Sequence, residues 1–159
     1  MQSSTTIQCR RASPADAALL AQLRYEFRAS HAPTIETEEE FLSRCAAWMV
    51  RRLGADAAWR AWLAECPAGL AGGVWFQVVE KLPNPNEETE LHAYVSNFYV
   101  RPEHRNAGAG SALLSTILDE CGRLGIDTVF LWPTERSRPL YERFGFQSER
   151  GVLVRKLDP

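Results

Sequence analysis

The chain has 159 residues, 45% of them hydrophobic, and a formal net charge of −2 at pH 7. This length, without a linker rich in Pro, Gly or Ser, predicts a single domain over residues 1–159. The small charge gives no general electrostatic reason to bind nucleic acid or an anionic membrane. The N-terminus lacks the apolar core of a signal peptide and no segment reaches the ~20 apolar residues of a membrane span, so we expect a soluble cytoplasmic protein.

The four cysteines, Cys9, Cys45, Cys66 and Cys121, are scattered along the chain. They form no Cys-x-x-Cys pair and have no neighbouring histidine pair of the kind that binds zinc. We therefore interpret them as reduced structural thiols and expect no metal site.

The N-terminal half predicts a strand, two helices and two further strands. A short strand covers residues 7–11, and Ser13-Pro14-Ala15-Asp16 is typical of a helix start, with proline at the first position and an acid in the first turn. The next helix begins at the capping box Thr37-Glu38-Glu39-Glu40 and continues with apolar residues at helical spacing toward Leu53. Two strands follow over residues 58–66 and 70–81, joined by a turn.

The C-terminal half begins with a polar loop over residues 83–88 and a strand over residues 91–100. A basic turn leads into a helix whose buried stripe ends near Gly125. We expect a buried strand at residues 129–132 and a short helix after Ser137, which can cap it. A final hairpin is predicted about Gly151, with strands over residues 146–149 and 152–157.

The turn between the strand at residues 91–100 and the next helix predicts an anion site. Gly108 and Gly110 allow close approach of a ligand to the backbone, and the first N–H groups of a helix have no intrahelical partner. Arg101, His104 and Arg105 lie in the same turn and add side-chain donors. A diphosphate or polyphosphate is the expected guest.

The spacing of these glycines distinguishes three kinds of phosphate-binding loop. A Walker-type loop needs a lysine directly after its second glycine, and none follows Gly110. A dinucleotide fingerprint needs a third glycine where the chain has Leu113. The remaining pattern, Arg105-x-x-Gly108-x-Gly110 after a strand that ends in Val-Arg-Pro, resembles the GCN5-related N-acetyltransferase (GNAT) superfamily, in which this loop holds the pyrophosphate of acetyl-coenzyme A.

A second segment resembles the same family. Residues 137–146, Ser-Arg-Pro-Leu-Tyr-Glu-Arg-Phe-Gly-Phe, are similar to the family's short helix, its tyrosine and its Gly-Phe exit. Two matches in the right order make chance similarity a poor explanation. The resemblance is specific over about residues 94–146 and compatible with the chain before that.

The resemblance implies a fold and a set of site residues. The implied fold is α/β (α+β), with a mixed, mostly antiparallel sheet of six to seven strands that splays between the fourth and fifth strands and is flanked by about four helices. A homodimer is compatible with this fold. Tyr141 is implied as the general acid that protonates the departing thiolate. The residues implied to bind the cosubstrate acetyl-coenzyme A (acetyl-CoA) are Phe98, Tyr99, Val100, Arg105, Asn106, Ala107, Gly108, Ala109, Gly110, Ser111 and Ser137, with backbone N–H groups around Phe98 to Val100 facing the oxyanion.

The reaction implied by the resemblance is acetyl transfer to a primary amine of a small molecule or peptide by direct attack in a ternary complex. The general base stays open, because Tyr94, Ser96 and Phe98 occupy one alternating face of the strand and none is a base. Water could relay the proton to one of three residues, or the amine could already be neutral. Those three residues are Glu26, Glu90 and His92.

Two other functions remain open at this point. One is a catalytically silent domain of the same fold that senses acyl-coenzyme A, and the other is an unrelated nucleotide-binding regulatory module. The five tryptophans, Trp48, Trp59, Trp62, Trp75 and Trp132, are expected to lie mostly in the core, with a minority lining an acceptor pocket.

Overall fold

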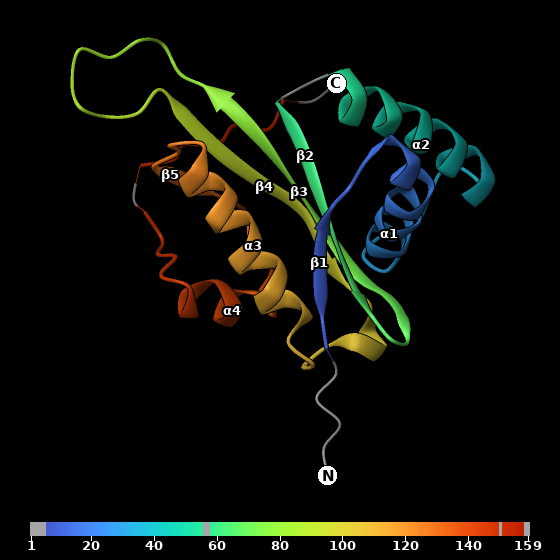
Figure 1. The fold of residues 1–159 in the computed structure, drawn as a ribbon. Helices are drawn as coiled ribbons and strands as arrows, with labels where there is room; N and C mark the ends of the chain where they lie inside the picture. Colours follow the sequence, from blue (N-terminus) through green and yellow to red (C-terminus); the bar gives the residue numbers. More distant parts are fainter. Residues whose placement is uncertain (1–5, 56–57, 150, 158–159) are drawn as a thin grey trace.

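A five-stranded sheet forms the centre of the protein in a computed structural model that describes residues 6–55, 58–149 and 151–157 (Figure 1). The strands lie side by side in chain order. The first four are antiparallel to their neighbours, and the fifth is parallel to the fourth. Their bounds are β1 Gln8–Arg11, β2 Trp59–Cys66, β3 Gly69–Glu80, β4 Leu91–Val100 and β5 Thr128–Phe130.

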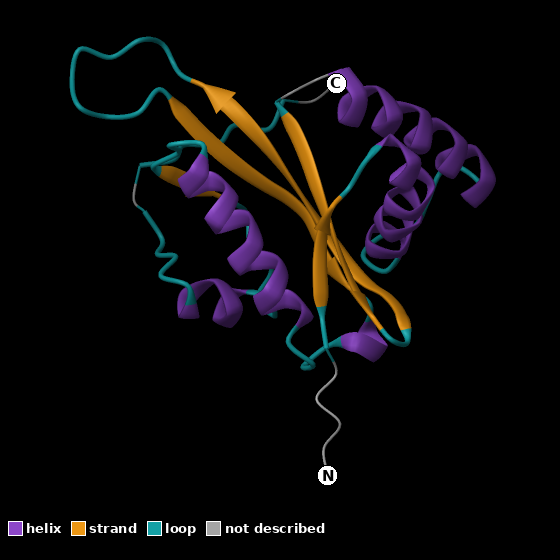
Figure 2. Ribbon diagram, viewed as in Figure 1, coloured by secondary structure: helices purple, strands orange, loops and turns teal. Residues whose placement is uncertain are grey.

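Four α-helices in the described part of the chain cover the two faces of this sheet (Figure 2). Helices α1 (Ala17–Ala29) and α2 (Glu38–Ala55) pack on one face, and α3 (Ala109–Arg123) and α4 (Arg138–Arg143) pack on the other. Each face has its own buried cluster, because both sides of the central strands carry apolar side chains. No described helix has both the length and the apolar character needed to cross a membrane.

The two helix starts predicted in the N-terminal half are confirmed. A 3₁₀ turn, η1 (Pro14–Asp16), precedes α1, and the Asp16 carboxylate accepts hydrogen bonds from the Ser13 backbone N–H at 2.8 Å and from the Arg10 guanidinium at 2.8 and 3.0 Å. The Thr37 hydroxyl accepts from the Glu40 N–H at 3.3 Å, and Glu40 accepts from the Thr37 N–H at 3.0 Å, which is the reciprocal capping box. These bonds satisfy N–H groups at helix starts that no intrahelical carbonyl can reach.

A buried ion pair joins the sheet to α3. The Glu120 carboxylate lies 2.6 Å from the Arg60 guanidinium of β2, and the two side chains are largely buried, at 12% and 13% exposed. Glu120 also accepts hydrogen bonds from Arg123 at 2.7 Å. These interactions, with Arg123 the largest cause, lower the pKa of Glu120, so the carboxylate stays ionised inside the protein.

The pairing of β3 with β4 is interrupted by a β-bulge. Gly73 pairs with Tyr99, whereas Trp75 pairs with Ser96, so β4 has one more residue than β3 in this stretch. Asn97 lies in the bulge with φ of 48°, a left-handed conformation that asparagine tolerates better than most residues.

This bulge exchanges the two faces of β4. Ala93, before the bulge, packs in the cluster beneath α3; after the bulge Phe98 packs in that cluster, and Tyr99 packs with α1 and α2. The prediction that Tyr94, Ser96 and Phe98 share one alternating face is therefore wrong, because strict alternation holds only within an uninterrupted strand.

The predicted C-terminal hairpin does not form. Residues 131–149 and 151–157 contain no strand, so the described chain has five strands rather than six or seven. Val152, Leu153 and Val154 are 73%, 98% and 68% exposed, and therefore bury little against the sheet. Strand propensity reflects packing on a pleated, half-buried surface, and β5 extends over only three residues, which makes it a short edge for a further strand to pair with.

Candidate functional site

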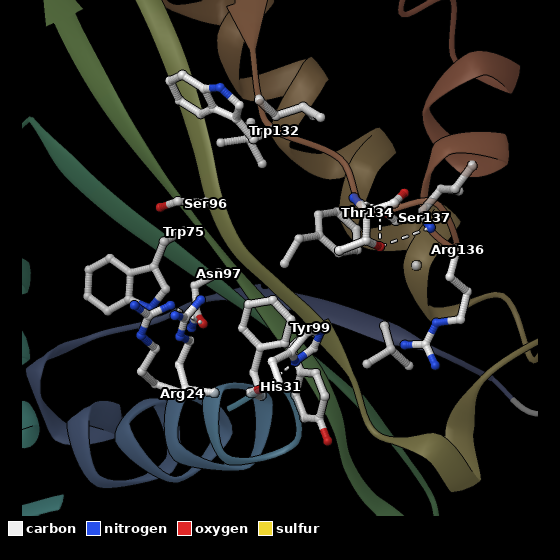
Figure 3. A pocket seen from close by; sticks show the side chains of 18 of the residues that line it. Arg24, His31, Trp75, Ser96, Asn97, Tyr99, Trp132, Thr134, Arg136 and Ser137 are labelled. Carbon is white, nitrogen blue, oxygen red and sulfur yellow. Dashed lines mark hydrogen bonds between the residues drawn. The ribbon is translucent and has the colours of Figure 1, made fainter. Parts of the chain in front are cut away.

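A large cavity opens where β4 and β5 separate. The two strands pair only from His92–Thr128 to Tyr94–Phe130. Beyond these pairs, residues 94–100 and residues 131–132 both line a cavity of about 1670 Å³. Figure 3 shows Arg24, Trp75 and Asn97 on one side of this cavity and Thr134, Ser137 and Arg136 on the other. The cavity thus passes between the two helical layers.

The N-terminus of α3 opens into the cavity without a side-chain cap. Gly108 precedes the helix with φ of 90° and Asn106 has φ of 59°, so the chain turns through left-handed conformations. The Ala112 N–H donates a hydrogen bond to the Gly108 carbonyl at 2.9 Å. Preceding N–H groups of the first turn are thereby left for a ligand, at the positive end of a 15-residue helix. This arrangement is typical of anion-binding sites.

Of the three basic side chains predicted beside these N–H groups, only Arg105 lines the cavity. Its Nε donates to the Val100 carbonyl at 3.0 Å, and the guanidinium lies 5.9 Å from the centre of the Tyr99 ring. This contact fixes the side chain through Nε and leaves the terminal nitrogens of its fork for a phosphate.

The expectation that Arg101 and His104 also serve the anion site is wrong. Arg101 is turned toward α1, where it donates to the Glu26 carboxylate at 2.8 and 3.0 Å and to the Leu70 carbonyl at 3.2 Å. The Nδ1 of His104 lies 3.7 Å from the Cys66 Sγ at the end of β2. The ion pair with Glu26 therefore holds the Arg101 guanidinium against α1, although the position of Arg101 in the sequence suggested that it would serve the turn.

Tyr141 lies in α4 with its ring between Phe98 and Phe146, at centroid distances of 5.9 and 5.6 Å. It is 6% exposed, and burial raises its pKa to about 12. The phenol therefore stays protonated throughout the physiological range. The close packing of α4 on α3 is allowed by Gly110, where a Cβ atom would lie 3.2 Å from Leu140 Cδ2.

Ser137 lines the cavity but does not cap α4 as predicted. Its own backbone is already helical, and its hydroxyl accepts from the Thr134 N–H at 2.9 Å (Figure 3). The Thr134 hydroxyl accepts in return from the Ser137 N–H at 3.2 Å. The reciprocal bonds lie one turn earlier than the sequence suggested, because the chain begins to coil at residue 134.

Ten of the twelve predicted site residues line the cavity. Ala107 and Ala109 do not: Ala107 is exposed, and Ala109 is buried in the cluster beneath α3. The ten that do are Phe98, Tyr99, Val100, Arg105, Asn106, Gly108, Gly110, Ser111, Ser137 and Tyr141.

None of the three groups predicted to receive the amine proton lines the cavity. Glu26 is held by Arg101, the Glu90 carboxylate accepts from the Asn84 N–H at 3.2 Å, and His92 lies within the part of β4 that pairs with β5. Among the described residues that line the cavity, Glu135 is the single carboxylate and His31 the single histidine. No group of three His, Cys, Asp or Glu residues in the described chain is placed to hold a metal ion.

The part of the cavity that lies toward α1 and α2 was not predicted from the sequence. Four of the five tryptophans line the cavity, so the expectation that only a minority would do so is wrong. Arg24 also lines it, and a signal was present: Arg24 lies four residues after Leu20 and three before Phe27, on the apolar face of α1. A charged residue at a core position indicates a site. The four tryptophans are Trp48, Trp59, Trp75 and Trp132.

Comparison with known proteins yields one family. The sequence profile of the acetyltransferase (GNAT) family matches residues 20–146. No curated protein matches the chain.

Solved structures of acetyltransferases have the same fold as this chain. A GCN5-related N-acetyltransferase from Ralstonia eutropha is 26% identical with a TM-score of 0.77, over 95% of this chain and 99% of that one. A predicted acetyltransferase with acetyl-CoA from Clostridium acetobutylicum is 22% identical with a TM-score of 0.78, over 95% and 96%. An aminoglycoside acetyltransferase from an uncultured soil metagenomic sample is 19% identical with a TM-score of 0.72, over 96% and 99%.

Proposed function

Because the chain belongs to the acetyltransferase (GNAT) family, we propose that it transfers an acetyl group from acetyl-CoA to a primary amine by direct attack within a ternary complex. The observation that carries the proposal is the uncapped N-terminus of α3 at the mouth of a cavity that also contains Tyr141. One end of this cavity suits a diphosphate and the middle suits a thioester.

The residues present fit acetyl-CoA along its length. The N–H groups of the first turn of α3 and the Arg105 guanidinium would hold the pyrophosphate. Beyond Tyr94, no described residue pairs with β4 on its β5 side, so the backbone of β4 can donate to and accept from the amides of the pantetheine arm, as a strand edge does with an added strand. Acetyl-CoA supplies an acetyl group activated as a thioester.

The bulge in β4 supports the proposed chemistry at the thioester. Backbone N–H groups near Phe98 to Val100 would donate to the carbonyl oxygen as negative charge develops on it. The new C–N bond forms to the carbonyl carbon and the C–S bond breaks, with its electron pair leaving on sulfur. Tyr141 then donates its phenolic proton to the thiolate.

The attacking amine must lose a proton, because an ammonium group is not nucleophilic. With Glu26, Glu90 and His92 away from the cavity, we infer that water carries this proton to solvent, or that the amine enters neutral. Among the described lining residues, His31 is the histidine and Glu135 the carboxylate that could take part in such a relay.

The proposal is tested by following the release of free thiol from acetyl-CoA in the presence of a panel of amines. Release that depends on both enzyme and amine, with the N-acetylated product identified by mass spectrometry, supports it. A catalytically silent acyl-CoA sensor would bind acetyl-CoA but release no thiol with any amine.

A thermal-shift measurement separates the remaining alternative, a nucleotide-binding module. A ligand at 100 times its Kd stabilises the native state by about 2.7 kcal/mol, which raises the Tm of a domain of this size by about 5–10 °C. We expect coenzyme A to produce this shift and NAD and ATP at equal concentration to produce little. A larger shift with NAD or ATP than with coenzyme A would contradict the proposal.

A further inference from the structure

The end of the cavity that faces α1 and α2 is strongly cationic. Among the described residues that line the whole cavity, six are arginines and one, Glu135, is a carboxylate. Three of the arginines, Arg24, Arg28 and Arg44, belong to α1 and α2, which contribute no carboxylate to the lining. These residues lie beyond the part of the cavity assigned to acetyl-CoA. This end is where an acceptor would bind, and its charge opposes a polycationic amine.

Arg24 is the most informative of the three arginines because it is partly buried and lacks a counter-ion. Arg44 is paired with Glu36, whereas Arg24 forms no ion pair with any residue that the structure describes. Its Nη1 donates only to the neutral Asn97 Oδ1, at 3.3 Å. Burial, followed by the nearby charge of Arg28, lowers the pKa of Arg24. A buried guanidinium is normally paired, so this one is set to receive an anion.

A second donor lies beside the first. Trp75, opposite Ser96 in the sheet, is 3% exposed, and its indole Nε1 is buried without a hydrogen-bond partner in the described structure. A buried indole N–H usually finds an acceptor. Figure 3 shows Trp75 and Arg24 on the same side of the cavity, with the Asn97 side chain beside them.

The surrounding walls are aromatic. The Trp48 and Trp59 rings lie 5.8 and 6.2 Å from the Trp75 ring, and all three residues line the cavity. An occupant of this region would therefore place an apolar group on the tryptophans while an anionic oxygen accepts hydrogen bonds from the guanidinium.

We propose that the acceptor is a small amine that also carries an anionic oxygen group, carboxylate or phosphate, bound by Arg24, with an apolar part that packs on Trp48 and Trp59. This inference rests on the proposed acetyl transfer for its place in the reaction, but the anion site can be measured on its own. In this arrangement Arg24 binds and orients the acceptor, and it takes no part in proton transfer.

The kinetic test compares amines that differ only in charge. With acetyl-CoA, we expect phenylalanine to be a better acceptor than phenylalaninamide, although the amide has the less basic and more readily neutral amine. O-phosphoethanolamine against ethanolamine tests phosphate in place of carboxylate, and spermidine and kanamycin test polycations. Arg24→Gln should raise the KM for the anionic acceptor by about 10–100-fold with a smaller change in kcat, the range expected for a lost charge-assisted hydrogen bond.

Three further variants separate binding from folding. Arg24→Lys keeps the charge but loses the planar fork, so its effect should be intermediate. Trp75→Phe should raise the same KM without abolishing turnover. Arg51→Gln, an exposed residue of α2 outside the cavity lining, removes one positive charge and should leave the KM unchanged. Circular dichroism and Tm show whether each variant is folded.

A binding measurement without turnover keeps the two proposals distinguishable. N-acetylphenylalanine should raise the Tm of the wild type and of Arg51→Gln but not of Arg24→Gln, and N-acetylphenylalaninamide should raise none of them. If that pattern appears while no amine releases thiol, the anion site stands and the proposed acetyl transfer fails. Turnover of cationic or neutral amines that is indifferent to Arg24, or no Arg24-dependent response to any carboxylate or phosphate probe, overturns the inference.

Discussion

Replacing Tyr141 by phenylalanine removes one hydroxyl group from the middle of the proposed site. The ring contacts with Phe98 and Phe146 remain, since they involve only the aromatic carbons. The hydroxyl makes no hydrogen bond to another described residue, so we expect a change in the free energy of unfolding below about 1 kcal/mol and a Tm within about 4 °C of the wild type.

The expected loss of activity is much larger. Without a proton donor the thiolate must leave unaided or take its proton from water, and removal of one general acid typically slows the chemical step by about 10²–10⁴-fold. Because burial raises the pKa of Tyr141 to about 12, the wild-type phenol does not ionise between pH 6 and 10. The variant should therefore lower kcat by a similar factor across that whole range, without changing the shape of the pH profile.

The assay is single-turnover thiol release, with coenzyme A affinity measured separately by thermal shift. Tyr25→Phe is the matched control, because it removes a hydroxyl from a half-buried tyrosine of α1 that lies outside the cavity lining. A Tyr141→Phe enzyme within threefold of the wild-type chemical rate, on an acceptor for which chemistry limits turnover, would refute the acid role and leave Tyr141 as a packing residue.

Four other substitutions test the cosubstrate loop and the scaffold. Gly108→Val forces a β-branched residue into φ of 90°, so it should abolish the rise in Tm that coenzyme A produces. Gly110→Ala should weaken that rise less, because the added Cβ would press only on the end of the Leu140 side chain. Equal effects of the two variants would contradict this ranking. Asp16→Asn should cost about 2 kcal/mol, or about 4–8 °C in Tm, near pH 7. Because the folded-state pKa of Asp16 lies below its unfolded value of about 3.9, that difference should be complete above about pH 4 and shrink as the pH falls further; a difference that grows in acid would contradict it. Glu120→Gln should lower the Tm by about 6–12 °C, since breaking a buried ion pair costs about 3 kcal/mol, and a change under 2 °C would show that the pair with Arg60 adds little.

Local signals account for what could be predicted from the sequence. The capping residues of α1 and α2, the apolar stripe of α3 and the glycine turn before it depend on neighbours within a few positions, so they can be recognised without knowledge of the fold. The prediction of an anion site rests on such local signals, because the loop, the helix N-terminus and Arg105 are contiguous.

The features that were mispredicted depend on partners distant in the chain. Arg101 turns away from the loop because Glu26, 75 positions earlier, lies within reach. The bulge at Asn97 is a mismatch with β3 and has no signature within β4 alone. The end of the cavity that we propose for the acceptor is lined by Arg24 from α1, Trp48 from α2 and Trp75 from β3, so only the packed fold brings them together.

The bulge has a consequence for how this chain can change its length. Deleting Asn97 would pair Phe98 with Val74 and restore simple alternation, so every later residue of β4 would keep its face and its partner on β3. Tyr99 would stay in the cluster of α1 and α2, whereas a residue added or removed between Tyr99 and Gly108 would change the orientation from which the turn that carries Arg105 starts. An insertion or deletion in the loop between β3 and β4, at residues 82–90, changes no register on either side. We therefore expect homologues of different length to vary freely in that loop and to keep the residue count of β4 from its bulge to Gly108 constant.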